Sequence, residues 1–292
     1  MRQGDLVVRN SYSRDVLFRI EHIDARDAIL KGVQYRLLAD APLDDLYRIE
    51  EAESFVDTRN SPGRVQETTR LLERHRQVQR ERNRIDFIQK LQGHPTFFEV
   101  PGKVLHLDGD PAYLRKSMDL YGQLRVPAEG YYSVESGMAE LLRRLLPQVK
   151  PDIVVVTGHD GLLKHIKNAD PYHLSSYKNS LQFVNAVRVA REYERNRDSL
   201  TIIAGACQSH FEALLQVGAN FASSPGRILI HALDPAYIAA KSAYTSVKET
   251  MDMLDVVQHT VSGLEGVGGL ESRGTYRVGL PRLKKFENMN IV

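Results

Sequence analysis

Two apolar runs in this chain each end in a glycine that is followed by a reactive side chain. Residues 153–161 are Ile-Val-Val-Val-Thr-Gly-His-Asp-Gly, and residues 200–207 are Leu-Thr-Ile-Ile-Ala-Gly-Ala-Cys, which ends in the only cysteine of the chain. Runs of this length, rich in β-branched residues, predict strands buried on both faces. If the two strands are neighbours, about 4.8 Å apart, Cys207 and His159 leave the same edge of the sheet, where open α/β sheets bind ligands. The pattern predicts a nucleophile beside a base.

A thiol attacks a carbonyl group as the thiolate, and an unperturbed cysteine has a pKa of about 8.5. An imidazolium at His159 and a short helix that begins near His210 would both lower the pKa of Cys207. The backbone amide of Cys207, together with that of Asp160 or of Gly161, could form an oxyanion hole. We therefore expect a cysteine peptidase.

Other interpretations of these residues stay open. A lone cysteine after a buried strand is often inert, and four other histidines compete as the base: His165, His173, His210 and His231. A glutamine amidotransferase or another α/β hydrolase would place Cys207 on a nucleophile elbow and take a later histidine, His231. A non-catalytic scaffold would carry a Cys207 no more reactive than free cysteine. Two strand–glycine–reactive-residue units separated by one helix favour the peptidase.

Composition is that of a globular protein: 292 residues, 42% hydrophobic, 26% charged and a net charge of +2. One cysteine excludes an internal disulfide and an all-cysteine metal site. We find no phosphate loop, dinucleotide fingerprint or zinc spacing, so no cofactor or metal is expected, although an activating cation stays open. No secretory signal or membrane helix is found, so we expect a cytoplasmic protein with no membrane partner. Its oligomeric state is unknown.

The chain divides into three parts by pattern. Residues 1–45 predict a small SH3-like β module, with strands near residues 5–9, 15–20 and 28–30. Residues 46–98 predict a polar, Arg-rich helical linker. Its apolar stripe should pack on the main domain, and interleaved acidic residues make nucleic-acid binding unlikely. The stripe is Leu71, Val78 and Ile85, and the acidic residues are Glu67, Glu73, Glu81 and Asp86.

Residues 99–292 alternate between predicted strands and helices, which indicates an α/β fold with a mainly parallel sheet flanked by helices. The strands are expected at residues 103–107, 130–134, 153–157, 200–207 and 227–230. The helices are expected at residues 111–123, 136–149, 179–196 and 211–217, with one or two long helices at residues 235–257. The glycine-rich residues 261–282 predict a loop or a flap.

The two strand ends resemble the two halves of the active-site signature of caspase-like (clan CD) cysteine peptidases, in the Thr-Gly-His and Ala-Gly-Ala-Cys segments. In that clan glycine usually follows the histidine directly, whereas here Asp160 intervenes before Gly161. The whole chain is similar to the YabG family of sporulation-specific proteases, from the opening Gly-Asp-Leu-Val-Val-Arg to at least the 240s. The resemblance implies a caspase-like peptidase domain in the mother cell of a sporulating bacterium, and association with the spore coat. It also implies that spore coat and spore-assembly proteins are the substrates, and that cleavage occurs beside basic residues, chiefly arginine.

A peptidase that selects arginine at P1, the residue before the cleaved bond, needs a carboxylate to bind the guanidinium. Asp108 and Asp110 end the first strand of the α/β domain, which should lie beside the strand of His159. We expect one of them to contact P1, with Asp160 and Asp234 as rivals, although both could simply shape the turn and cap a helix. An arginine-directed peptidase could also cleave itself near Arg64, in the exposed linker.

Overall fold

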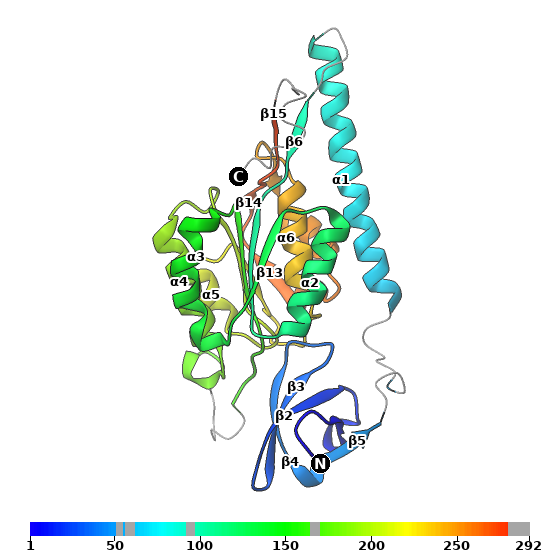
Figure 1. The fold of residues 1–292 in the computed structure, drawn as a ribbon, viewed down its shortest axis with the longest axis vertical. Coiled ribbons are helices and arrows are strands. Elements are labelled where there is room, and N and C mark those ends of the chain that lie inside the picture. Colours follow the sequence, from blue (N-terminus) through cyan, green and yellow to red (C-terminus); the bar gives the residue numbers. More distant parts are fainter. Residues whose placement is uncertain (51–54, 56–61, 92–96, 164–169, 280–292) are drawn as a thin grey trace.

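The computed structural model describes residues 1–50, 55, 62–91, 97–163 and 170–279. Figure 1 shows an antiparallel β module, a larger α/β domain above it and a long helix, α1, along one side. The module lies below the edge of the central sheet from which the site residues emerge.

The N-terminal module is a five-stranded antiparallel sheet with the order β4-β3-β2-β1-β5. Its strands are β1 (Leu6–Arg9), β2 (Phe18–Asp24), β3 (Asp27–Gly32), β4 (Leu38–Pro42) and β5 (Leu46–Ile49), with short 3₁₀ turns at Asn10–Tyr12 and Leu43–Asp45. Alternation of buried and exposed residues along β2 and β3 places one face of this sheet on an apolar core. That core also contains Cys207 and Ile230, so the module packs directly on the candidate site.

The central sheet of the α/β domain has the order β13-β11-β10-β9-β7-β8, and only β13 is antiparallel to its neighbour. Its strands are β7 (Val104–Asp108), β8 (Ala128–Tyr132), β9 (Ile153–Thr157), β10 (Thr201–Ala204), β11 (Phe221–Ser223) and β13 (Val267–Gly269). Two small antiparallel pairs accompany it, β6 (Phe98–Val100) with β15 (Arg277–Gly279) and β12 (Thr250–Met251) with β14 (Ser272–Arg273). The predicted α/β class and the mainly parallel sheet are confirmed.

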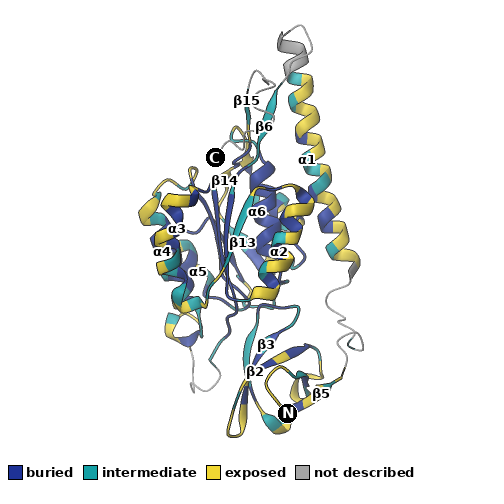
Figure 2. Ribbon diagram, viewed as in Figure 1, coloured by how far each residue is buried: buried dark blue, intermediate teal, exposed yellow. Residues whose placement is uncertain are grey.

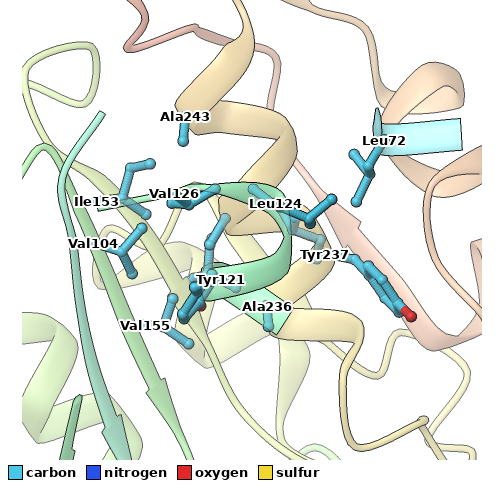
Figure 3. Close-up of a cluster of buried hydrophobic side chains, with 14 of the residues drawn as sticks. Leu72, Val104, Tyr121, Leu124, Val126, Ile153, Val155, Ala236, Tyr237 and Ala243 are labelled. Carbon is cyan, nitrogen blue, oxygen red and sulfur yellow. The ribbon is translucent and has the colours of Figure 1, made fainter. Parts of the chain in front are cut away.

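Helices cover both faces of this sheet (Figure 1). They are α2 (Pro111–Leu124), α3 (Met138–Val149), α4 (Ser180–Tyr193), α5 (Phe211–Gln216), α6 (Asp234–Tyr244), α7 (Met253–Gln258) and α8 (Gly263–Gly266), with 3₁₀ turns at Glu135–Gly137 and Leu174–Ser176. Alternate residues of each strand face opposite layers, as Figure 3 shows for Val104, Ile153 and Val155 against α2 and α6. Val154 and Val156 face α3 and α4 instead. Burial on both faces explains why the strand sequences are continuously apolar.

Helix α1 (Pro62–Leu91) packs on the α/β domain by a different face from the one expected. Leu71, Val78 and Ile85 are 38%, 42% and 46% exposed, whereas Leu72 is only 3% exposed. Polar side chains make much of the interface: Thr69 bonds the hydroxyl of Tyr237 at 3.1 Å, and Gln79 bonds Glu249 at 2.7 Å. The expected stripe was wrong because hydrogen-bonded polar residues carry no apolar periodicity. Figure 2 shows the outer face of α1 exposed along its described length.

Two other expectations are corrected. Residues 227–230 are not a strand; the strand is β11, and residues 228–230 pass beside Cys207 as an irregular segment bonded to Gln208 and to Cys207. An apolar run alone does not distinguish a strand from a buried irregular segment. Residues 235–257, where one or two helices were expected, contain α6 and the short α7. Part of the glycine-rich tail forms α8 and strands of the sheets, rather than only a loop or flap. In the described part of the chain, no helix has the length and apolar character needed to cross a membrane.

Candidate active site

Cys207 and His159 follow neighbouring parallel strands. The ladder pairs Val156 of β9 with Ala204 of β10, an offset of 48 residues (204 − 156) that equals the separation of the two site residues (207 − 159). It continues beyond the strands, because the amide of Gly205 donates to the carbonyl of Val156 at 3.0 Å. Gly205 has a φ of +106°, a conformation that L side chains rarely adopt, so the turn leading to Cys207 requires glycine. The two side chains thus leave the same edge of the sheet at the same level.

Burial disfavours the charged form of both side chains. Burial raises the pKa of the Cys207 thiol to about 12, although the backbone of Ile230 and the charge and backbone of Arg36 act to lower it. Its Sγ accepts a hydrogen bond from the amide of Ile230 at 3.1 Å. Burial lowers the pKa of His159 to about 4, and neither ring nitrogen has a hydrogen-bond partner among the described residues. Both shifts favour the neutral thiol and the neutral imidazole in this structure, whereas the thiolate is the form that attacks a carbonyl group.

The amides of Cys207 and Asp160 converge on one oxygen. Each donates a hydrogen bond of 3.2 Å to the carbonyl oxygen of Arg36, a residue of the N-terminal module. Two backbone donors on one carbonyl oxygen have the geometry of an oxyanion hole. The amide of Gly161 is directed elsewhere, to the carboxylate of Asp160 at 2.8 Å. The sequence offered the amide of Asp160 or of Gly161 as the second donor of an oxyanion hole. In the structure, the amide of Asp160 is the one that shares an acceptor with the amide of Cys207.

The side chain of Asp160 is fully buried and organises the loops around the site. Its Oδ1 accepts the amides of Gly161 and Asn179, both at 2.8 Å, and its Oδ2 accepts the hydroxyls of Ser180 at 2.5 Å and Ser209 at 2.9 Å. Burial raises the pKa of Asp160, against the lowering by these four hydrogen bonds. With its oxygens engaged in this way, Asp160 is a structural carboxylate and not a ligand for a substrate arginine. It takes the position at which the caspase-like signature has glycine.

Asp108 and Asp110, paired in the sequence, have different partners. Asp108 is fully buried at the end of β7 and accepts two hydrogen bonds of 2.9 Å from the guanidinium of Arg36. Burial alone would raise the pKa of Asp108, but the charge of Arg36 and the hydrogen bonds to the carboxylate lower it to about 2. Asp110 caps α2 by accepting the amides of Ala112 and Tyr113 at 2.7 and 3.1 Å. Its other oxygen is 3.8 Å from Nε2 of His159.

Tyr113, on the first turn of α2, contacts both halves of the site. Its ring stacks on His159 with centroids 5.3 Å apart, and the guanidinium of Arg36 lies 4.9 Å from the centroid of the same ring. Its hydroxyl donates to the carbonyl oxygens of Tyr35, at 2.9 Å, and of Gly32. Burial raises the pKa of Tyr113 well above its ordinary value, so the hydroxyl stays a donor. Tyr113 therefore positions the imidazole and the arginine relative to each other.

The competing histidines and the remaining aspartate have other partners. His210 caps α5 and bonds the carbonyl of Tyr172 at 3.0 Å, while His173 is exposed beside Asp170. Nδ1 of His231 accepts the amide of Leu233 at 3.3 Å. His165 lies outside the described residues. Asp234 accepts the amides of Val261 and Ser262 at 2.7 and 3.2 Å.

Several residues of the site carry no sequence signal of their own. Arg36 lies in an N-terminal module whose function the sequence did not reveal, and Tyr113 looked like a core residue of a helix. Glu135 accepts the amide of His159 at 2.9 Å, and Gly158 makes room for it, since a Cβ there would lie 2.5 Å from the Glu135 carboxylate. This fit between a glycine and a half-buried carboxylate is visible only in the structure and gives no signal in the sequence. A pocket of about 210 Å³ opens beyond Leu37 and Leu38, against Leu162 and Gln208.

Known proteins to which this chain is similar include a family of peptidases and a sporulation protease. The family model described as YabG peptidase U57 matches residues 2–281. The sporulation-specific protease YabG of Bacillus subtilis (strain 168) is 41% identical over 283 residues, which cover 95% of this chain and 97% of that protein. A chain of the RcsB response regulator of Salmonella typhimurium aligns with 41% of this chain and 50% of its own length, at 16% identity and a TM-score of 0.27, too low to carry an argument.

These matches define the class of the protein, which is a peptidase. The chain belongs to the YabG peptidase family, U57.

Proposed function

We propose that this protein is a cysteine endopeptidase that cleaves spore coat and spore-assembly proteins after arginine, with Cys207 as the nucleophile and His159 as the general base. The observation that carries the proposal is the placement of Arg36. Its carbonyl oxygen accepts the amides of Cys207 and Asp160, and its guanidinium is held by Asp108. A substrate arginine bound in the same way would have its carbonyl carbon beside the only thiol of the chain. The similarity to the sporulation-specific protease of Bacillus subtilis supports a role in sporulation.

The catalytic cycle follows from these positions. The thiol of Cys207 transfers its proton to His159 and the sulfur attacks the carbonyl carbon of the P1 arginine. The oxygen, now negatively charged, accepts the amides of Cys207 and Asp160. The C–N bond breaks, the amine leaves with the proton from His159, and a thioester remains on Cys207. Water, deprotonated by His159, then hydrolyses the thioester and returns the thiol.

Asp108 and Asp110 have separate parts in this proposal. Asp108 binds the guanidinium bidentately in a site without solvent, a geometry that lysine does not reproduce. Asp110 lies 3.8 Å from Nε2 of His159 and would stabilise the imidazolium that forms during the reaction. Arginine selectivity is therefore assigned to Asp108, and support of the base to Asp110.

Two alternatives remain distinguishable. An amidotransferase-like hydrolase with a cysteine elbow would use His231 as its base. In the structure, however, Nδ1 of His231 accepts the amide of Leu233, two residues further along the chain. A non-catalytic spore scaffold would leave Cys207 unreactive. The proposed enzyme would act in the mother cell cytoplasm and at the spore coat, on protein substrates and without a metal or cofactor in the steps above.

The test is cleavage of fluorogenic peptides with arginine, lysine, aspartate or glutamine at P1. Wild type would be compared with Cys207→Ala, His159→Ala and His231→Ala. We expect arginine-directed cleavage that is abolished by the first two substitutions and retained by the third. Loss with His231→Ala but not with His159→Ala would favour the elbow hydrolase, and the absence of cleavage from every sample would favour the scaffold.

A further inference from the structure

Residues 34–38 run through the candidate active site as an extended strand that is paired on both sides. On one side, the carbonyl of Gln34 accepts the amide of Ala232 at 3.2 Å, next to an antiparallel bridge between Tyr35 and His231. On the other side, the amide of Leu38 donates to the carbonyl of Asp160 at 2.8 Å, next to a parallel bridge between Leu37 and Asp160. Main-chain pairing of this kind is how extended peptides bind to enzymes and other receptors that read a strand.

Arg36 presents both recognition elements of a P1 residue at once. Its carbonyl oxygen accepts the amides of Cys207 and Asp160, and its fully buried guanidinium bonds Asp108 twice at 2.9 Å and the carbonyl of Ala232 at 2.9 Å. The charge and backbone of Arg36 also act on the thiol of Cys207. An arginine that only anchored the module would need the ion pair but not a carbonyl held by the two amides beside the thiol.

The neighbouring glycine makes room for this strand. A Cβ at Gly161 would lie 2.3 Å from the carbonyl oxygen of Leu38, so only glycine allows the backbone after Arg36 to approach so closely. The space left by the missing side chain of Gly161 is an observation independent of the ion pair with Asp108. It accommodates the residues after Arg36, which correspond to the part of a substrate that leaves on cleavage.

We propose that residues 34–38 are an internal substrate, and that the enzyme cleaves its own Arg36–Leu37 bond as the step that opens the active site. The inference rests on the proposed function and extends it to the chain's own activation. Arg36 replaces Arg64 as the expected site of self-cleavage, because Arg64 lies in the first turn of α1 and its backbone is helical rather than extended.

The step balances as an ordinary thiol peptidase reaction. Cys207 Sγ bonds the carbonyl carbon of Arg36 and passes its proton to His159, the Arg36–Leu37 C–N bond breaks, and the amine of Leu37 leaves with that proton. Water hydrolyses the thioester, which leaves a carboxylate on Arg36 and a thiol on Cys207. The new carboxylate is a negative charge in a buried site, which is costly to keep away from water, so the cut end can leave the site and admit a substrate arginine.

Cleavage would nick the chain without releasing the module at once. Strand β4 stays with the larger fragment but pairs with β3 of the smaller one, and β1 pairs with β5 across the nick. The fragments 1–36 and 37–292 should therefore co-elute under native conditions and separate in denaturant.

The experiment follows freshly purified full-length protein over time by intact mass and N-terminal sequencing, beside cleavage of an arginyl fluorogenic peptide. We expect a new N-terminus at Leu37-Leu38-Ala39-Asp40, a first-order rate that does not change with protein concentration, and a lag in peptide cleavage with the same time constant. Cys207→Ala should stay intact. Arg48→Gln, on the exposed surface of β5, is the matched control and should be cleaved as wild type.

Two variants separate binding of the strand from its cleavage. Leu37→Pro keeps Arg36 and its ion pair, and proline favours the extended backbone before it while making a poor leaving group; it should stay uncut, with peptide cleavage remaining low. Arg36→Gln should stay uncut and cleave the peptide without a lag. If Arg36→Gln does not fold, because Asp108 loses its partner, Leu37→Pro still decides.

The outcomes distinguish this inference from the proposed function. Arginyl peptide cleavage without a lag by a chain that stays intact would overturn the inference and leave the peptidase standing, as would self-cleavage only at Arg64 or another bond. No cleavage of the peptide or of the chain would instead overturn the proposed function, and the inference with it.

Discussion

Arg36 and Asp108, 72 residues apart in the chain, are joined by two hydrogen bonds of 2.9 Å with both side chains fully buried. A buried ion pair stabilises a protein little in net terms, because the cost of removing two charges from water offsets their attraction. Removing one partner is costly, however, since the other charge is then buried alone. The pair thus joins the N-terminal module to the α/β domain at the point where the proposed enzyme would bind its substrate.

Substitution of Asp108 and substitution of Asp110, at and just after the end of β7, should affect peptide cleavage differently. Asp108→Asn removes the charge that holds the guanidinium and should lower kcat/KM for arginyl peptides by on the order of 100-fold, since a hydrogen bond to a charged group contributes about 1.5–3 kcal/mol. Selectivity for arginine over lysine should fall with it. Asp110→Asn keeps the helix cap and should lower kcat while leaving that selectivity unchanged.

Steady-state kinetics with matched arginyl and lysyl peptides measure both effects, and circular dichroism checks that each variant folds. The assignment of Asp108 to P1 would be wrong if arginine selectivity survived in Asp108→Asn and fell in Asp110→Asn.

Stability should depend on pH through His159. Burial lowers its pKa from 6.5 to about 4, so the folded state binds fewer protons than the unfolded state between these values. The free energy of unfolding is therefore unaffected by this histidine above pH 6.5 and decreases as the pH falls towards 4. The decrease is on the order of 3 kcal/mol for one such group. His75, whose pKa is also lowered to about 4 by burial, adds a similar loss.

Urea unfolding of wild type and His159→Asn at pH 6.5 and pH 4.5 measures the difference. We expect His159→Asn to lose less free energy of unfolding over this interval, and His75→Gln to reduce the loss independently. Equal pH dependence in wild type and His159→Asn would mean that His159 is not held neutral by burial.

Two glycines of the α/β domain should respond oppositely to alanine. At Gly161 a Cβ would lie 2.3 Å from the carbonyl oxygen of Leu38, so Gly161→Ala should push the strand of residues 36–38 out of the site. At Gly122, on the exposed face of α2, no atom lies within 4 Å of the added Cβ. Gly122→Ala should therefore raise stability by up to about 1 kcal/mol.

Thermal unfolding and limited proteolysis between β3 and β4 provide the measurements, with both glycine variants made in the Cys207→Ala background, which should not cut itself there. Gly161→Ala should unfold at a lower temperature and expose this connection to proteolysis, whereas Gly122→Ala should leave it as protected as it is in Cys207→Ala alone. Equal protection in both variants would contradict the close approach at Gly161.

The docking face of α1 predicts a contrast between adjacent leucines. Leu72 is 3% exposed and packs in the core with α6, while Leu71 is 38% exposed. Truncation of a buried leucine costs about 2–5 kcal/mol, so Leu72→Ala should destabilise by that amount and Leu71→Ala by less than about 0.5 kcal/mol. Chemical denaturation of both variants measures this, and equal losses would argue for the apolar stripe expected from the sequence.

The sequence predicted those parts of the site that depend on local patterns. β9 (Ile153–Thr157) has the predicted bounds, because a run of β-branched residues that ends in glycine is a strong strand signal. Residues paired between β9 and β10 are separated by the same number of positions as His159 and Cys207, because the two strands are neighbours in parallel register. Continuous apolar runs, which are typical of strands buried on both faces, and the alternation of strands with helices together predicted the mainly parallel sheet.

The remainder depends on contacts between distant segments. Arg36 is one of 39 basic residues, and nothing in its neighbours separates it from the others until the module folds against Asp108. Residues 228–230, beside Cys207, have the apolar composition of a strand but belong to no strand of the described sheets. The interface of α1 is formed by hydrogen bonds between polar side chains, which hydrophobic periodicity does not detect.

The central claim is that Cys207 attacks the carbonyl carbon that follows an arginine side chain. An arginyl chloromethyl ketone tests it directly, because the reagent alkylates a nucleophile only where its arginine is bound. Wild type and Arg36→Gln would be treated with it and with the aspartyl analogue, then digested and analysed by mass spectrometry. We predict one adduct, on Cys207, with the arginyl reagent only, and its loss in Asp108→Asn. Adducts on Cys207 that do not depend on the P1 side chain, or an arginine-dependent adduct on another residue, would contradict the account.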